Sequence, residues 1–250
     1  MIKKILSTLL VSSALFVFAA TGSFAERPTI AIGATVQYGG FTASGQENEG
    51  AGTPQEMNKK DATGAYGYTS LFVEASFAER VTVGASWMAD AIQSEVTSRT
   101  DSLCSITTKL PIEGCSSIVD SGNDTGTSSV SARFSNLVTG YVELSIWNGL
   151  YAKYGVMEMD VETKESLHTD SSYPNAEMDG TTYGLGWKGS FDNGMFIKTE
   201  TMMQDFDDIY LVAVSTADTT GTPAVSVVNG NTVRSSLSGA LATISIGKAF

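Results

Sequence analysis

The chain ends on the stretch ATISIGKAF, residues 242–250. Ile244 and Ile246 alternate with small or polar residues, so their side chains lie on one face of an extended strand and the polar ones on the other. The alternation continues to the final residue, the aromatic Phe250. This stretch predicts a β-strand with one apolar face that runs to the end of the chain.

Seven further segments alternate with the same period of two. The eight expected strands are residues 30–41, 64–77, 81–95, 127–146, 150–163, 181–191, 195–210 and 233–250. Their connections alternate in length. Three are tight turns at residues 78–80, 147–149 and 192–194, and four are long and polar, at residues 42–63, 96–126, 164–180 and 211–232. An even number of strands joined by alternating short turns and long loops is typical of transmembrane β-barrels.

The first 25 residues have the features of a secretory signal. Lys3 and Lys4 precede an apolar stretch at residues 5–20, and Ser23 and Ala25 supply the small residues that a signal peptidase requires. We therefore expect a signal peptide at residues 1–25, in preference to a retained anchor, and a single barrel domain at residues 26–250. After residue 25 no apolar run approaches the length of a membrane helix, so a membrane-embedded mature chain must cross as a closed barrel.

Composition excludes one class of partner. The chain has 15 basic and 27 acidic residues, and without Lys3 and Lys4 the mature chain has a net charge near −14. Nucleic-acid binders carry basic patches, so no nucleic-acid partner is expected. The 42% hydrophobic content is modest for a membrane protein, but a barrel exposes only every second residue to lipid.

Together, the export signal, the eight alternating segments and the terminal Phe250 resemble the small bacterial outer-membrane barrels of the OmpA transmembrane-domain and OmpX type. The resemblance covers residues 30–250 in pattern. It implies an all-β fold, a closed antiparallel up-and-down transmembrane barrel of about eight strands in the outer membrane of a Gram-negative bacterium. It also implies that Phe250 acts as the assembly signal read by the outer-membrane insertion machinery. Lys248 departs from the pattern, because an apolar residue is more usual there.

The faces opposite the apolar ones carry charges of both signs. If the apolar faces contact lipid, the lumen receives Glu74, Arg133, Glu143, Lys153, Lys188, Lys198 and Glu200. An eight-stranded barrel is wide enough only for side chains to fill it. Buried charges need partners, so we expect an ion-pair network that plugs the lumen. A narrow gated pore is the alternative.

Other motifs predict no chemistry. The glycine pattern GLGWKG at residues 184–189 lies inside an alternating strand without a following helix, which argues against a dinucleotide site. His168 is the only histidine, and no nucleophile is identifiable near it. Cys104 and Cys115 share one expected loop, and a disulfide between them is the default in an oxidising compartment. The acidic residues near the loops show no ordered spacing for a metal, so neither a metal nor a cofactor is expected.

The sequence therefore favours a non-enzymatic, monomeric barrel that supports the envelope and displays surface loops, with adhesion as one use of those loops. A porin-like channel for small solutes is the first alternative, and an enzyme acting on lipid at the membrane rim is the second. The expected partners are outer-membrane lipid, lipopolysaccharide and the insertion machinery.

Overall fold

The computed structural model describes residues 28–49, 56–77, 80–103, 124–166, 171–216 and 226–250. All regular elements among them are β-strands. They are β1 (Thr29–Glu49), β2 (Glu56–Phe77), β3 (Val81–Met88), β4 (Ile92–Gln93), β5 (Thr97–Leu103), β6 (Asp124–Trp147), β7 (Leu150–Ser166), β8 (Ser171–Ser172), β9 (Ala176–Ser190), β10 (Met195–Thr216) and β11 (Ser226–Ala249). No helix among the described residues is long and apolar enough to cross a membrane. The expected signal peptide lies outside these residues.

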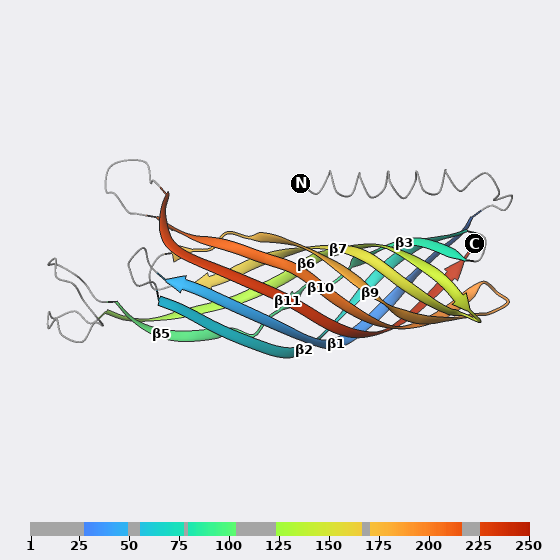
Figure 1. The fold of residues 1–250 in the computed structure, drawn as a ribbon, viewed down its shortest axis with the longest axis horizontal. Helices are drawn as coiled ribbons and strands as arrows, with labels where there is room; N and C mark the ends of the chain where they lie inside the picture. Colours follow the sequence, from blue (N-terminus) through green and yellow to red (C-terminus); the bar gives the residue numbers. More distant parts are fainter. Residues whose placement is uncertain (1–27, 50–55, 78–79, 104–123, 167–170, 217–225) are drawn as a thin grey trace.

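The strands form one closed antiparallel ring of eight (Figure 1). Its order is β1, β2, β3, β6, β7, β9, β10 and β11, and β11 pairs with both β10 and β1. The ring closes between the two ends of the barrel domain, where Ala31 lies opposite Ala249. The expected fold, an up-and-down barrel of about eight strands, is confirmed.

The third position of the ring is interrupted. β3, β4 and β5 follow one another along the same edge of β6. β2 pairs with β3 from Ser70 to Phe77, and Thr69 then accepts a backbone hydrogen bond of 3.0 Å from Ala89. Beyond this point, within the part of the chain that the structure describes, β2 continues its ladder with β1 alone.

Tight turns join the strands at one end of the barrel, which also holds the C-terminus (Figure 1). Between β6 and β7, Asn148 and Gly149 have φ angles of 45° and 83°. Two successive residues with positive φ form the turn type that matches the twist of a hairpin, and Asn-Gly is the pair that adopts it most readily. Gly194, with φ of 82°, has the same role between β9 and β10. This turn end is the periplasmic end in outer-membrane barrels.

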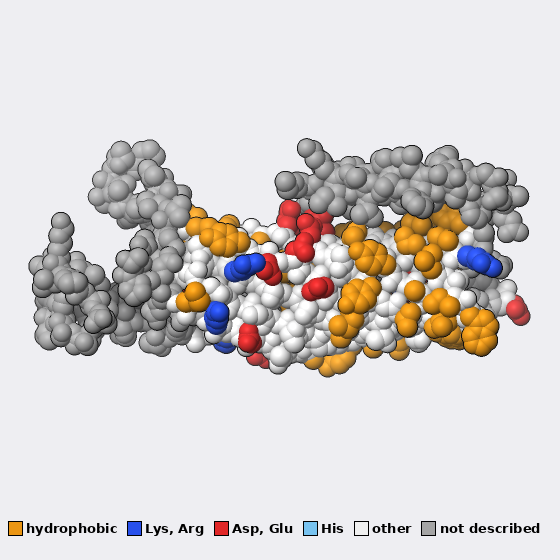
Figure 2. Space-filling view, in the orientation of Figure 1, with side chains coloured by type: hydrophobic (Ala, Val, Ile, Leu, Met, Phe, Trp, Pro, Cys, Tyr) orange, Lys and Arg blue, Asp and Glu red, His pale blue; other side chains and the backbone are white. Residues whose placement is uncertain are grey.

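A belt of apolar side chains surrounds the half of the barrel near the tight turns (Figure 2). All eight ring positions contribute exposed residues to it: Ile30, Ile32, Val36 and Tyr38 on β1, Leu71 and Val73 on β2, Trp87 on β3, Val142, Leu144 and Ile146 on β6, Tyr154 on β7, Tyr183, Leu185 and Trp187 on β9, Ile197 and Met203 on β10, and Ile244 and Ile246 on β11. On β1 the belt spans nine residues, about the 9–11 that a tilted strand needs to cross the hydrocarbon core. In water such a surface is strongly unfavourable, and in a bilayer it is the expected one.

The strands continue past this belt, as the length of several expected segments indicated, but they do so further than the sequence predicted. The expected loop at residues 42–63 is largely strand, because β1 extends to Glu49 and β2 begins at Glu56. In this extension the outer face is polar, as at Thr42 and Ser44. The inner face is apolar and contains the largest buried cluster among the residues that the structure describes. Polarity is therefore inverted along the barrel: apolar outside in the belt, and apolar inside beyond it.

Candidate functional site

Within the described part of the chain, six charged side chains face the lumen at the level of the belt. Glu74 comes from β2, Glu143 from β6, Lys153 from β7, Lys188 from β9, and Lys198 and Glu200 from β10. Each lies on the strand face opposite the exposed apolar residues, because alternate side chains point to opposite faces. The alternation that places isoleucine and leucine against lipid therefore places these charges inside. We call Glu74, Glu143, Lys153, Lys198 and Glu200, which are in direct contact, the lumen network.

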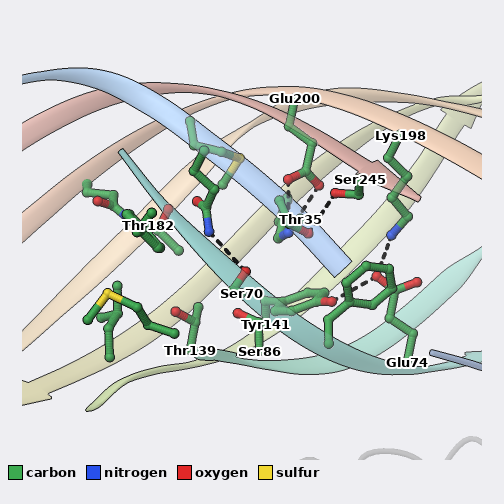
Figure 3. Close-up of a pocket in the computed structure, with 18 residues that line it drawn as sticks. Thr35, Ser70, Glu74, Ser86, Thr139, Tyr141, Thr182, Lys198, Glu200 and Ser245 are labelled. Atoms are coloured by element: carbon green, nitrogen blue, oxygen red, sulfur yellow. Dashed lines mark hydrogen bonds and ion pairs between the residues drawn. The ribbon is translucent and has the colours of Figure 1, made fainter. Parts of the chain in front are cut away.

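Lys198 is the centre of the lumen network and is 1% exposed. Its ammonium donates to both carboxylate oxygens of Glu143, each at 2.8 Å. It also donates to Oε1 of Glu74, as Figure 3 shows. One cation thus joins carboxylates from two strands on the far side of the lumen, which links β10 with β2 and β6 through the interior.

Lys153 forms the second half of the lumen network. Its ammonium lies 3.0 and 3.2 Å from the two oxygens of Glu200 and 3.7 Å from Oε1 of Glu143. Tyr151 donates a hydrogen bond of 2.6 Å to Glu200, and Thr243 donates one of 3.0 Å. Glu200 therefore has partners for both oxygens, as a buried carboxylate requires.

The charges in the lumen balance when Lys188 is included. The lumen network has three carboxylates and two ammonium groups, and the ammonium of Lys188 lies nearby, 4.3 Å from the ring centroid of Phe196. Tyr141 donates a hydrogen bond of 2.8 Å to Oε1 of Glu74. Oε2 of Glu74 has no hydrogen-bond partner among the described residues. Glu74 is therefore the least satisfied member of the lumen network.

Glycines opposite aromatic residues make room for the ring side chains of the lumen. A Cβ atom on Gly186 would lie 2.4 Å from Cζ of Tyr151, and one on Gly33 would lie 2.4 Å from Cζ of Phe72. Each glycine is the direct cross-strand partner of that aromatic residue. The pairs Gly84–Tyr141 and Gly247–Phe196 repeat the arrangement. The glycines at 184 and 186 thus line the lumen and have no phosphate-binding geometry.

A small polar cavity of about 40 Å³ lies next to the lumen network (Figure 3). Hydroxyl groups dominate its wall, among them Thr35, Ser70 and Thr139. Thr35 is hydrogen-bonded to Ser245 at 2.8 Å, and Gln37 donates to Ser70 at 3.1 Å. Such a volume holds roughly one to three water molecules, since each needs at least ~10–15 Å³. It is far smaller than the water-filled channel of a large porin.

A methionine-rich layer fills the barrel on the loop side of the lumen network. Its buried members are Tyr68, Met88, Leu137, Met157, Met159, Val161, Met178, Met202, Phe206 and Leu241. Gln204 links two tyrosines beside this layer. It accepts a hydrogen bond of 2.8 Å from Tyr66 and donates one of 3.0 Å to Tyr68. Nearer the tight turns, Phe196 packs with Ala31 and partly buried Ala249, and the ring of Phe72 reaches this cluster from the level of the network. Packed side chains therefore occupy the lumen on both sides of the charges.

Of the seven predicted lumen charges, Arg133 is misplaced. It is exposed on the outer face of β6, where its guanidinium lies 3.3 Å from Glu162. The register of β6 against β7 shifts between Ser135 and Val138, and Asn136 in this bulge has φ of 55°. One extra residue reverses the faces of the strand beyond it. The sequence prediction assumed uninterrupted alternation and so assigned Arg133 to the wrong face.

Sequence reasoning also missed the tyrosines and the methionine layer. Tyr141 stands two residues before Glu143, and Tyr151 two residues before Lys153. Residues two apart on a strand point to the same face, so the sequence could have placed both tyrosines in the lumen. The methionines were not recognisable, because an inward apolar residue beyond the belt has the same alternation as a lipid-facing one.

Phe250 is exposed at the turn end, and its backbone N–H donates a hydrogen bond of 2.8 Å to the carbonyl oxygen of Ile30. Cys104, Cys115 and His168 lie outside the described residues, and no three His, Cys, Asp or Glu residues within them are grouped to hold a metal.

No protein-family model matches the chain, and no curated protein matches it in sequence. Among solved structures it is similar to the outer membrane protein OprG of Pseudomonas aeruginosa, with 12% identity, a TM-score of 0.45, and coverage of 87% of this chain and 96% of that one. It is also similar to the outer membrane protease OmpT of Escherichia coli, with 8% identity, a TM-score of 0.44, and coverage of 88% and 97%. The attachment invasion locus protein Ail of Yersinia pestis matches at 10% identity and a TM-score of 0.32, with coverage of 87% and 99%.

The physical features of the chain itself identify its class. Its ladder is closed at the level of the belt, so no strand edge is left unpaired against hydrocarbon there. Its outer face is apolar over the length of a membrane crossing, and its inner face is charged and polar at the same level. The chain is an integral outer-membrane β-barrel.

Proposed function

We propose that this barrel is a non-enzymatic structural protein of the outer membrane whose role is to display its surface loops. The observation that carries the proposal is the lumen network, which spans the interior at the level of the belt. Glu74, Glu143 and Lys198 are each less than 5% exposed. A solute crossing the membrane would have to displace them.

Opening such a network is costly. Removing one partner from a buried ion pair typically destabilises a protein by about 3–5 kcal/mol, because the other charge remains buried and unpaired. Phe196, packed with Ala31 and Ala249, lies on the turn side of the network, and the methionine layer lies on the other side. A continuous water path would require rearrangement of all three layers, which favours a plugged barrel.

The loop side supports a display function. β1, β2, β6, β10 and β11 each contain 21 to 24 residues, although about 9–11 suffice to cross the membrane. The apolar interior of this extension gives it a core of its own. The strands at the loop end therefore form a wall that extends beyond the belt, and loops on rigid scaffolds are where binding functions concentrate. Adhesion fits this arrangement.

Single-channel recording tests the proposal against a porin-like channel, which the small hydroxyl-lined cavity favours. The refolded protein in a planar bilayer is expected to give no discrete conductance steps. Glu143→Gln with Lys198→Met removes central charges, and Lys248→Met, on the exposed strand end, serves as a matched control. Stable steps from the unmodified protein at neutral pH would establish a channel and overturn the plugged barrel. If the unmodified protein gives no conductance steps and only the double variant conducts, the plugged barrel is supported most directly.

A further inference from the structure

A hollow of about 420 Å³ lies on the outer wall of the barrel, well beyond the belt. It is lined by Gln46 and Asn48 of β1, Asp208 and Tyr210 of β10, and Thr232 and Arg234 of β11. The volume falls within the ~300–1,000 Å³ typical of small-molecule sites. The belt, the lumen network and the methionine layer share none of these residues.

Strand register brings the six side chains together. Arg234 lies directly opposite Gln46 on one side and Tyr210 on the other, and Thr232 lies opposite Asn48. Directly paired residues point to the same face of a sheet. Arg234 and Tyr210 are both about two-thirds exposed, at 67% for the arginine side chain and 65% for the tyrosine. All three strands therefore present these residues to the outside.

A bulge in β10 creates the hollow. Its register against β11 shifts between Phe206 and Ile209, and again between Val212 and Val214. Bulges bend the strand that contains them and redirect its side chains. The loop end of the β10–β11 hairpin bends away from its neighbours (Figure 1). Because of the first bulge, Asp208 and Tyr210 both point outward beside a bent wall.

The polar groups in the hollow are held in place. Nε of Arg234 donates to Oδ2 of Asp208 at 2.9 Å, and its terminal nitrogen lies 2.7 Å from the same oxygen. Gln46 donates to the side-chain oxygen of Asn48 at 3.2 Å. Arg234 is thus neutralised by Asp208, and the two amides still have donors and acceptors free for a ligand.

We propose that this hollow binds a neutral saccharide. A sugar presents hydroxyl groups that both donate and accept, which two amides, a threonine hydroxyl and an Arg–Asp pair can match. It also presents a face of C–H groups, which packs on an aromatic ring such as that of Tyr210. A sulfated or phosphorylated glycan is disfavoured, because Arg234, the one cation that lines the hollow, is already paired with Asp208, and a second aspartate, Asp207, stands next to Asp208 in the sequence.

The height of the hollow agrees with this ligand. Gln46 is eight residues beyond Tyr38, where the belt ends on β1. At about 3.3 Å per residue this is roughly 26 Å along a tilted strand. The headgroup region adds only about 5–8 Å to each side of the hydrocarbon core. The hollow therefore lies in the carbohydrate layer above the outer leaflet, within reach of the sugars of neighbouring lipopolysaccharide or of glycans arriving from outside.

The test measures binding to the full-length mature protein in lipid nanodiscs. The probes are the dephosphorylated core oligosaccharide of the producing cell's lipopolysaccharide, a panel of neutral oligosaccharides, and a sulfated oligosaccharide. Saturable binding of a neutral probe is expected. If the core oligosaccharide binds, the source is the membrane's own lipopolysaccharide, and if only other neutral glycans bind, the source is external.

Variants locate the site. Tyr210→Ala is expected to weaken binding at least about tenfold, while Tyr210→Phe retains most of it, because the ring supplies the packing face. Tyr38→Ala is the matched control, since Tyr38 is also 65% exposed and lies on β1, which contributes to the hollow, but within the belt. Heat-modifiable migration on gels establishes that each variant is folded. Absence of saturable binding to every neutral probe, equal weakening by Tyr38→Ala, or binding of the sulfated probe alone would overturn the proposal.

Discussion

Replacing Lys198 with Met measures how much the lumen network stabilises the barrel. The Lys198 ammonium donates two hydrogen bonds of 2.8 Å to Glu143 and one to Glu74, and the residue is 1% exposed. Each hydrogen bond to a charged group contributes roughly 1.5–3 kcal/mol. Part of this free energy is recovered in the variant, when water or a proton reaches the carboxylates of Glu74 and Glu143 that have lost their partner. The expected loss in free energy of unfolding is therefore about 3–5 kcal/mol, the usual range when one partner of a buried ion pair is removed.

Equilibrium urea unfolding in lipid vesicles, followed by tryptophan fluorescence, measures this loss. Lys248→Met, which removes an exposed lysine, should change the free energy of unfolding by no more than about 0.5 kcal/mol. Adding Glu143→Leu to Lys198→Met should recover at least half of the loss, because an apolar pair then replaces an unpaired charge. Glu74 would still accept its hydrogen bond from Tyr141. A loss below about 1 kcal/mol for Lys198→Met, or a double variant no more stable than the single one, would refute the reasoning.

Three further results are expected. Deleting Phe250 should leave export intact but lower the amount of heat-modifiable barrel in the outer membrane, because it removes the last backbone bond to β1; unchanged levels would contradict its role in assembly. Gly186→Ala should lower the free energy of unfolding by about 1–3 kcal/mol through overpacking against a tyrosine ring. Gly40→Ala, whose Cβ would meet its nearest atom at 3.6 Å, should be neutral in the same assay. Cysteine at Ser172 should react with an impermeant reagent on intact cells, and cysteine at Asn148 only after the outer membrane is permeabilised; the reverse pattern would invert the orientation.

Alternation and turn chemistry made the belt half of the barrel predictable. The Asn-Gly pair at 148–149 was located from sequence because few other residues adopt two successive positive φ angles. Strict alternation was also enough to place Glu74 and Lys198 on the inner face, since no bulge interrupts their strands in the belt. The terminal strand ending on Phe250 supplied the eighth member of the ring.

The loop half was not predictable by the same rules. Residues 42–49 consist of small and polar side chains, which from sequence are typical of a loop, yet they pair with residues 56–63 of β2, and residues 42–48 also pair with residues 232–238 of β11. Once the strands leave the lipid, a polar outer face is favourable, so the apolar signal that marks a membrane strand disappears. The bulge at Asn136 could not be recognised in the sequence either. A single inserted residue there was sufficient to move Arg133 to the outer face.

The pairing of β1 with β11 has a consequence for how the protein is made. Ala31 and Ala249 lie near the two ends of the barrel, so the contact that closes the ring joins residues of very large sequence separation. Contacts of large sequence separation form slowly, because loop closure must precede any gain from pairing. The ring cannot close until the C-terminus has been synthesised and exported. The chain must therefore reach the outer membrane before β1 and β11 pair with each other, so shielding of the two strand edges that later meet should raise the yield of the barrel.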